Sequence, residues 1–172
     1  MGVLEMFSLS GKVALVTGGA GLYGRQIVEA IAEAGAKTYV ASRNLSNLEE
    51  LANDFQSKGL EIFPKELDQK SEESVNALLR NLLEENDRVD ILINNAVLRP
   101  MKGWDAPIAQ FEESMQANAT GIFMMTRAFG NHMAKMGGGV SCLRTRVSWW
   151  KAETAVSGAL TVKRKSKVGI AG

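Results

Sequence analysis

The chain has 172 residues, of which 45% are hydrophobic and 23% charged, and its 20 basic and 19 acidic residues leave a formal net charge of +1. These values are typical of one soluble globular domain, and they exclude a collagen-like, wholly disordered or coiled-coil protein. No apolar run is long enough to span a membrane, and the single cysteine, Cys142, cannot form an internal disulfide, so we expect a cytoplasmic protein.

Strands and helices are predicted to alternate along residues 1–140. Lys12–Thr17 is a short apolar, β-branched run of the kind found in buried strands, and from Leu22 to Gly35 apolar residues recur at helical spacing. Further strands are expected at 38–41, at 60–63 running on to Asp68, and at 89–93, with helices at 45–58, from the N-cap Ser71 to Leu82, and at 108–135. Short connections between them indicate an α/β fold with a doubly wound parallel sheet of the Rossmann type.

The composition changes after the glycine run Gly137–Gly139. Residues 141–172 carry seven basic residues against one acid and have no clear period, whereas residues 1–140 carry 13 basic and 18 acidic residues. We therefore divide the chain into a folded domain, 1–140, and a basic tail, 141–172, of unrelated composition.

A glycine-rich turn joins the first predicted strand to the first predicted helix. It contains a GxGxxG pattern, in which glycines permit a tight turn, a close backbone approach to a pyrophosphate and close packing of helix on strand. The free N–H groups of the helix N-terminus add a site for phosphate. The turn therefore predicts a dinucleotide site, with a merely structural turn as the alternative. The candidate binding residues are Thr17, Gly18, Gly19, Gly21, Leu22, Tyr23 and Gly24.

The end of the second predicted strand bears on the choice between NAD(H) and NADP(H). A binder of NAD usually carries an acid there for the ribose 2′-hydroxyl, but this chain has Ser42-Arg43-Asn44. The planar guanidinium of Arg43 can pair with a 2′-phosphate. The sequence thus favours NADP(H) over NAD(H), with Ser42 and Asn44 as secondary contacts and a merely solvated surface arginine as the alternative.

The order of these motifs resembles the short-chain dehydrogenase/reductase family over about residues 8–140. After the glycine turn and Ser42-Arg43-Asn44 come Leu67-Asp68, Asn94-Asn95-Ala96 and Asn118-x-x-Gly121. The resemblance implies that Asp68 hydrogen-bonds the adenine. It also implies that Asn94, Asn95 and Ala96 stabilise the sheet and line the cofactor groove.

The same resemblance implies that Asn118 is a catalytic residue, which helps to hold a proton-relay water near an active-site lysine. Taken singly, Asn94 and Asn95 also fit a strand-end turn, and Asn118 also fits a helix residue that hydrogen-bonds to its own turn. Two positions depart from the family pattern. Leu22 stands where the compact branch usually has glycine, and Val97 replaces the glycine of the family's NNAG.

The acid–base residues of the family are missing from this sequence. The family uses a Ser on the fifth strand and a Tyr-x-x-x-Lys, in which the lysine lowers the pKa of a phenol that would otherwise lie near 10. The only tyrosines here are Tyr23 and Tyr39, both before the fourth predicted strand. Our hypothesis is that residues from about 141 onward come from a shifted reading frame, so we expect the sheet to stop after its fourth strand and the long helix.

Three functions remain open from the sequence. The first is an NAD(P)(H)-dependent oxidoreductase for a carbonyl or hydroxyl group of a small-molecule substrate, truncated and catalytically impaired. The second is a non-catalytic NADP(H)-binding module. The third, nucleic-acid binding through Lys163–Lys167, is disfavoured because no aromatic stacking platform accompanies it. The family also pairs part of the long helix across a dimer interface, which implies a homo-oligomer. No metal site is predicted, since the chain has one histidine, His132.

Overall fold

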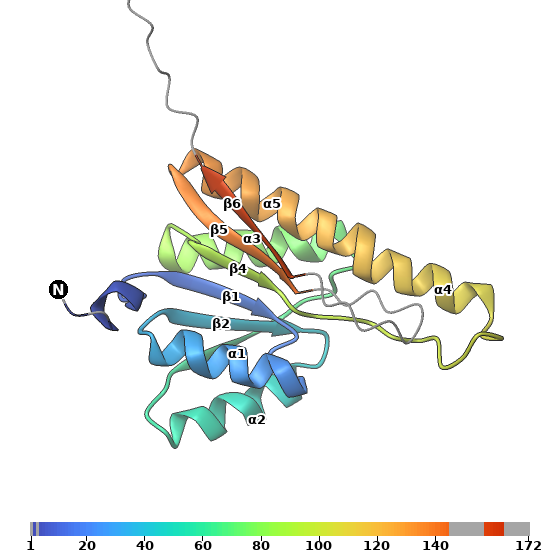
Figure 1. The fold of residues 1–172 in the computed structure, drawn as a ribbon, viewed down its shortest axis with the longest axis horizontal. Helices are drawn as coiled ribbons and strands as arrows, with labels where there is room; N and C mark the ends of the chain where they lie inside the picture. Colours follow the sequence, from blue (N-terminus) through green and yellow to red (C-terminus); the bar gives the residue numbers. More distant parts are fainter. Residues whose placement is uncertain (1, 3, 145–156, 164–172) are drawn as a thin grey trace, which may run out of the picture.

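The computed structural model describes residues 2, 4–144 and 157–163 (Figure 1). A 3₁₀ turn, η1 (Leu4–Phe7), precedes the first strand. The strands are β1 (Val13–Thr17), β2 (Lys37–Ser42), β3 (Ile62–Glu66), β4 (Ile91–Asn94), β5 (Gly138–Arg144) and β6 (Ser157–Lys163). The α-helices are α1 (Leu22–Glu33), α2 (Leu45–Gln56), α3 (Glu72–Asn86), α4 (Ile108–Met115) and α5 (Ile122–Lys135). The predicted N-cap of the third helix is confirmed, because Ser71 accepts a hydrogen bond from the N–H of Ser74.

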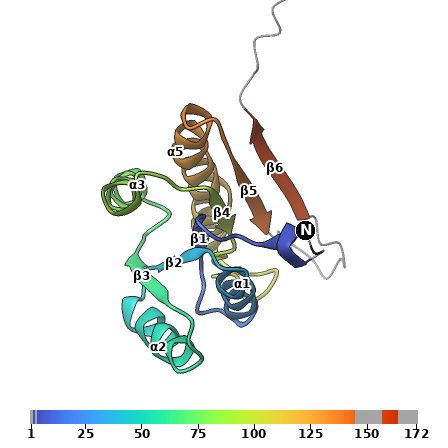
Figure 2. The same ribbon diagram turned by 90° about the vertical axis from the view of Figure 1, so that its left-hand side faces the viewer.

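The strands form one sheet in the order β3-β2-β1-β4-β5-β6. Neighbours from β3 to β5 are parallel, and β6 is antiparallel to β5. Two apolar layers cover the sheet: α1 and α2 pack on one face around Val28 and Leu48, and α3 and α5 pack on the other around Leu78 and Phe129 (Figure 2). The predicted Rossmann-type, doubly wound α/β fold is confirmed.

The sheet extends further than the sequence predicts. We expected it to stop after the fourth strand, with that strand at the edge, but β5 pairs with β4 in parallel from Val140 to Leu143. The glycines before this segment allow the chain to turn off α5, since Gly137 has a φ of 95° and a Cβ on Gly139 would lie 2.6 Å from the Met133 Cγ. Pairing satisfies the N–H and C=O groups that an edge strand leaves open.

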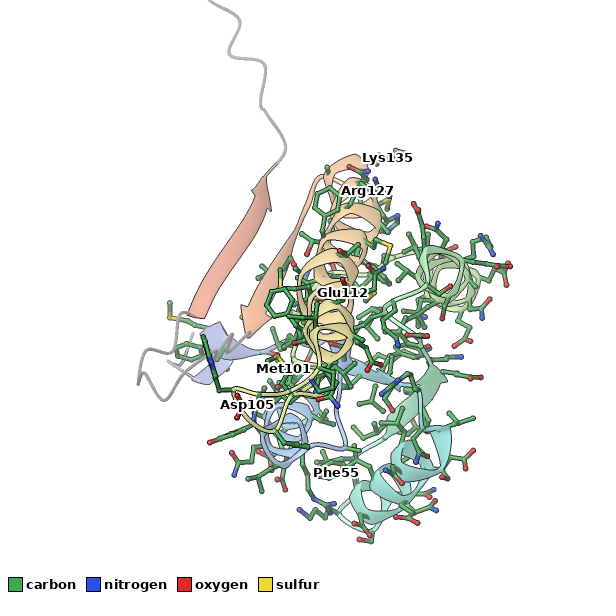
Figure 3. All side chains as sticks on the ribbon, turned by 90° about the vertical axis from the view of Figure 1, so that its right-hand side faces the viewer. Phe55, Met101, Asp105, Glu112, Arg127 and Lys135 are labelled. Atoms are coloured by element: carbon green, nitrogen blue, oxygen red, sulfur yellow. The ribbon has the colours of Figure 1, made fainter. Side chains whose placement is uncertain are left out.

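The long helix predicted at 108–135 is continuous but not α-helical throughout. Residues Gln116–Gly121 form a π-helical turn, here called the π segment, between α4 and α5. Figure 3 shows the succession of Glu112, Arg127 and Lys135 along this helix, with Met101 and Asp105 on the loop before it. Short π-helical turns inside α-helices often accompany functional sites.

The proposed tail is described only in part. Residues 145–156 and 164–172, which include both tail tryptophans and most of the basic cluster Lys163–Lys167, lie outside the described residues, whereas β6 lies within them. None of the helices in the described part of the chain is long and apolar enough to cross a membrane.

Asp90 joins the starts of three strands. Its side chain is buried and accepts hydrogen bonds from the N–H of Val13 at 3.0 Å and from Arg88, and its backbone carbonyl accepts from the N–H of Val140. Burial alone raises the pKa of Asp90, but the Arg88 and Val13 hydrogen bonds and the charges of Arg88 and Lys12 outweigh it and lower the pKa below its ordinary value of 3.8.

We predict that Asp90→Asn lowers the free energy of unfolding by about 2 kcal/mol near neutral pH, because hydrogen bonds to a buried charge are lost. A folded-state pKa below the unfolded one stabilises the fold above the unfolded pKa, and this contribution disappears as pH falls through the folded pKa. Urea denaturation at a series of pH values should therefore show the wild type and the variant converging in acid. A stability difference that stays constant down to strongly acidic pH would contradict this role.

Candidate functional site

A cavity of about 400 Å³ opens at the carboxyl ends of the parallel strands. Its wall comes from the loops that follow β1, β2, β3 and β4, the first turn of α1 and the end of β2, with one residue from the π segment. Ligands of doubly wound sheets bind in this crevice, at the point where the strand order reverses, which here is between β1 and β4. The wall residues are Gly18, Ala20, Gly21, Leu22, Tyr23, Gly24, Ala41, Ser42, Arg43, Leu67, Asp68, Gln69, Lys70, Asn95, Ala96, Val97, Leu98, Arg99 and Ala117.

The glycine turn brings the start of α1 close to the end of β1. A Cβ on Gly24 would lie 2.1 Å from the carbonyl oxygen of Gly18, so only glycine allows this packing. Gly18 itself has a φ of 67°, and a Cβ there would lie 2.8 Å from the Cα of Ala96. No side chain caps the helix at Gly21, and the first N–H groups of an α-helix lack intrahelical acceptors. This end of the cavity is therefore suited to an anion.

Thr17 and Asn95 hold the loops after β1 and β4 together. The hydroxyl oxygen of Thr17, which is fully buried, accepts the N–H groups of Asn95 and Ala96, each at 3.0 Å. The Asn95 amide donates to the carbonyls of Thr17 at 3.1 Å and Gly18 at 3.0 Å. Asn94, also buried, instead contacts Thr126 of α5. Thr17 thus does not line the cavity but holds in place the residues that do.

The β2 side of the cavity carries Ser42 and Arg43. Arg43 is exposed, and its guanidinium makes no hydrogen bond or ion pair with any residue that the structure describes. Asn44 lies outside the wall, because its side chain caps α2 by accepting from the N–H of Asn47 at 3.2 Å. The Ser42 hydroxyl donates to the Asn44 carbonyl. Arg43 therefore offers a positive charge on the β2 side of the cavity.

The loop after β3 contributes Asp68, Gln69 and Lys70 to the wall. One carboxylate oxygen of Asp68 accepts the N–H of Lys70 at 3.0 Å, and the Ser74 hydroxyl accepts the N–H of Asp68. The Lys70 ammonium pairs with Glu113 of α4 at 3.1 Å. Asp68 is therefore held by its own loop, half-buried, beside the cavity.

Asn118 lies in the π segment and not on the cavity wall as the structure describes it. Its Oδ1 accepts the N–H of Leu98 at 2.8 Å, and its Nδ2 donates to the Leu98 carbonyl at 2.6 Å and to the Ser114 hydroxyl at 3.1 Å. The amide thus fixes both backbone groups of one residue in the loop after β4. That residue, Leu98, is on the wall.

Ten of the predicted site residues lie on the wall, and the others support it. The wall includes Gly18, Gly21, Leu22, Tyr23, Gly24, Ser42, Arg43, Asp68, Asn95 and Ala96. Behind or beside it lie Thr17, Gly19, Asn44, Asn94 and Asn118. The prediction missed Ala20, Ala41, Leu67, Gln69, Lys70, Leu98, Arg99 and Ala117 as wall residues. Most of these residues are next to predicted positions in the sequence. Extending each motif by a few residues would therefore have included them.

No three His, Cys, Asp or Glu side chains gather into a metal-binding group within the described part of the chain. His132 lies on α5, where burial and the nearby charge of Lys135 lower its pKa despite the opposing charge of Asp90. The cavity offers backbone N–H groups, a guanidinium and a carboxylate, a donor and acceptor set that fits a nucleotide.

Comparison with known proteins identifies relatives of the described domain. The sequence model of the family described as short chain dehydrogenase matches residues 12–141. An uncharacterized oxidoreductase from Thermotoga maritima is 33% identical over 133 residues, which are 77% of this chain and 52% of the relative. The 7alpha-hydroxysteroid dehydrogenase of Escherichia coli K12 is 32% identical over 132 residues, with the same coverages. The chain thus spans about half the length of these curated relatives.

Solved structures show the same arrangement. A short-chain type dehydrogenase/reductase from Mycobacterium marinum superposes with a TM-score of 0.81 at 29% identity, over 91% of this chain and 65% of that one. A 7α-hydroxysteroid dehydrogenase complexed with NADH and 7-oxo glycochenodeoxycholic acid gives 0.77 at 30% identity, over 84% and 57%. The Pseudomonas aeruginosa RhlG/NADP complex gives 0.69 at 30% identity, over 76% and 51%.

The contact between Gly24 and Gly18 generates a prediction. Gly24→Ala should lower the free energy of unfolding by about 1–3 kcal/mol, because the new methyl group forces α1 away from the turn. The control is Gly21→Ala, in which the Cβ would lie at an ordinary 3.4 Å from the Gly18 carbonyl. Thermal denaturation of both variants measures the difference. Equal destabilisation by the two substitutions would show that the close approach at Gly24 is unimportant.

Proposed function

This chain belongs to the short chain dehydrogenase family, and from that premise we propose that it is the dinucleotide-binding part of an NAD(P)(H)-dependent oxidoreductase. The substrate class is a small molecule with a carbonyl or hydroxyl group. The observation that carries the proposal is the cavity between β1 and β4. It combines a helix start that no side chain caps with the Arg43 guanidinium, which has no partner among the described residues.

The wall residues fit the parts of such a cofactor. The start of α1 suits the pyrophosphate, because the glycine turn lets the backbone approach and the helix N-terminus carries partial positive charge. Asp68 and Leu67 offer a carboxylate and an apolar surface for the adenine. When bound, the nicotinamide supplies or accepts a hydride. Val97 and Leu98 would face the part of the cofactor farthest from Arg43.

We propose NADP(H) rather than NAD(H) as the preferred cofactor. Arg43 is the support, since it follows β2 on the wall, has no described partner, and matches a phosphate with its planar guanidinium. Among the relatives, one structure holds NADH and another holds NADP. Membership of the family therefore does not decide between NADP(H) and NAD(H), and the preference depends on residues such as Arg43.

We further propose that the chain binds its cofactor better than it catalyses. An acid–base group of suitable pKa is needed to move the proton that accompanies hydride transfer. The sequence has no Tyr-x-x-x-Lys. The side-chain amide of Asn118, the proposed catalytic asparagine, is hydrogen-bonded to the N–H and the carbonyl of Leu98. The alternative function, a non-catalytic NADP(H)-binding module, differs from the first only in the absence of all turnover.

Self-association through the long helix is a further proposal. Phe123 of α5 is 60% exposed, with the Arg127 guanidinium 5.3 Å from its ring centroid, and Ile108 at the start of α4 is 72% exposed. Exposed apolar side chains on one helix favour contact with a partner surface. A second copy of this chain is the partner that the family resemblance implies.

Titration with NADPH and NADH tests the cofactor proposal. We expect tighter binding of NADPH, and we expect Arg43→Ala to weaken NADPH binding about tenfold or more while leaving NADH binding nearly unchanged, since only the contact with the 2′-phosphate is lost. Isothermal titration calorimetry gives both affinities. Arg80→Ala, an exposed arginine of α3 outside the cavity wall, is the matched control. Equal loss in both arginine variants, or no binding of either cofactor, would refute the proposal.

Oxidation of NADPH in the presence of carbonyl substrates separates the two functions. The impaired oxidoreductase should show slow consumption above the background without protein, and Asn118→Ala should reduce it further. The binding module should show cofactor affinity with consumption at the background rate. Fast turnover that is insensitive to Asn118→Ala would contradict the proposed role of that residue.

A further inference from the structure

The loop after β3 meets the π segment at Gln69. The Gln69 amide Nε2 donates to the backbone carbonyl of Ala117 in the π segment at 3.0 Å, and both residues lie on the wall. Ala117 is 2% exposed, so its carbonyl has little access to water. A carbonyl inside a π-helical turn also accepts a helical N–H, so Gln69 adds a second donor from a loop 48 residues earlier in the chain.

The π segment is shaped to receive this loop. A Cβ on Gly121 would lie 2.5 Å from the Gln69 carbonyl oxygen and 3.2 Å from its Cγ. Gly121 therefore leaves the space in which the backbone of Gln69 sits. A second contact between the loop after β3 and the long helix is the ion pair of Lys70 with Glu113. Both side chains are partly exposed, and such pairs contribute little to stability.

The Ala117 carbonyl belongs to the same rigid peptide unit as the N–H of Asn118. Any rotation of that unit moves the Asn118 side chain, which holds the N–H and the carbonyl of Leu98. Gln69, Ala117, Asn118 and Leu98 thus form one continuous path. It leads from the loop that carries Asp68 to the loop after β4.

We propose that Gln69 is a positioning residue, which sets the orientation of Asn118 and through it the place of Leu98. The inference rests on the proposed function in one respect: if a dinucleotide binds in the cavity, Asp68 lies beside one end of it and Leu98 beside the other. A ligand that binds beside Asp68 restricts the motion of the loop that carries Gln69. Through the π segment, this restriction also fixes the position of Leu98. The two ends of the cavity are coupled through a side chain that need not touch the reacting atoms.

Hydrogen exchange in the chain without ligand tests the path directly. The reporter is the amide of Leu98, because it donates to Asn118 Oδ1. Gln69→Leu keeps the size of the side chain but cannot donate, and we expect exchange at Leu98 to become about fivefold faster, the effect of losing one net hydrogen bond. The control Gln116→Leu makes the same change on an exposed position of the π segment and should leave Leu98 unaltered. Equal exchange in all three proteins overturns the proposal.

Gln69→Glu adds a readout that a merely structural loss would not give. A carboxylate repels the Ala117 carbonyl, whereas a protonated carboxyl group donates to it. After correction for intrinsic exchange, Leu98 should be poorly protected near neutral pH and regain protection at about pH 5, where the half-buried carboxyl becomes protonated. Protection that does not respond to pH in this variant overturns the proposal, even if Gln69→Leu proves unstable.

A binding experiment distinguishes failure of this inference from failure of the proposed function. Wild type should bind both NADPH and the fragment 2′,5′-ADP, and Gln69→Leu should weaken NADPH more than the fragment. Equal weakening of both ligands contradicts the coupling alone. Absence of NADPH binding by wild type, together with faster Leu98 exchange in Gln69→Leu, contradicts the proposed function and supports the positioning role.

Discussion

The structure depends on the buried hydroxyl of Thr17, which joins the ends of β1 and β4. One side-chain oxygen accepts the N–H groups of Asn95 and Ala96 where the loop leaves β4, while the Asn95 amide returns to the carbonyls of Thr17 and Gly18. These groups are shielded from water. Leaving one of them without a hydrogen bond would therefore destabilise the fold by more than a formed hydrogen bond stabilises it. The strand order reverses at this junction, and the cavity opens beside it.

This junction divides the polar residues into two kinds. Thr17, Asn95 and Asn118 use their hydrogen-bonding capacity on backbone groups and thereby fix the shape of the loops. The Arg43 guanidinium, by contrast, makes no hydrogen bond or ion pair with the described residues, and no side chain caps the start of α1. A rigid frame with available donors pre-organises a site, since a ligand then binds without ordering the loops first.

The sequence predicted the parallel sheet and the glycine turn because both follow from local patterns. Apolar β-branched runs separated by helical spacing define the strands, and the GxGxxG pattern lies between a strand and a helix. The path of β5 was missed because Gly138–Arg144 lacks a strong local signal, and pairing with β4 decides its structure. The π segment and the Gln69 contact were missed because they arise between residues far apart in sequence, which no local pattern records.

The central claim is that the cavity beside the Thr17 junction binds an adenine dinucleotide. Amide chemical-shift mapping of the full chain during addition of NADPH tests it most directly. The account predicts the largest changes at Gly18, Ser42, Asp68 and Val97, which line the cavity at the carboxyl ends of four different strands. Changes confined to α5 or to β6, with these four amides unmoved, would contradict it.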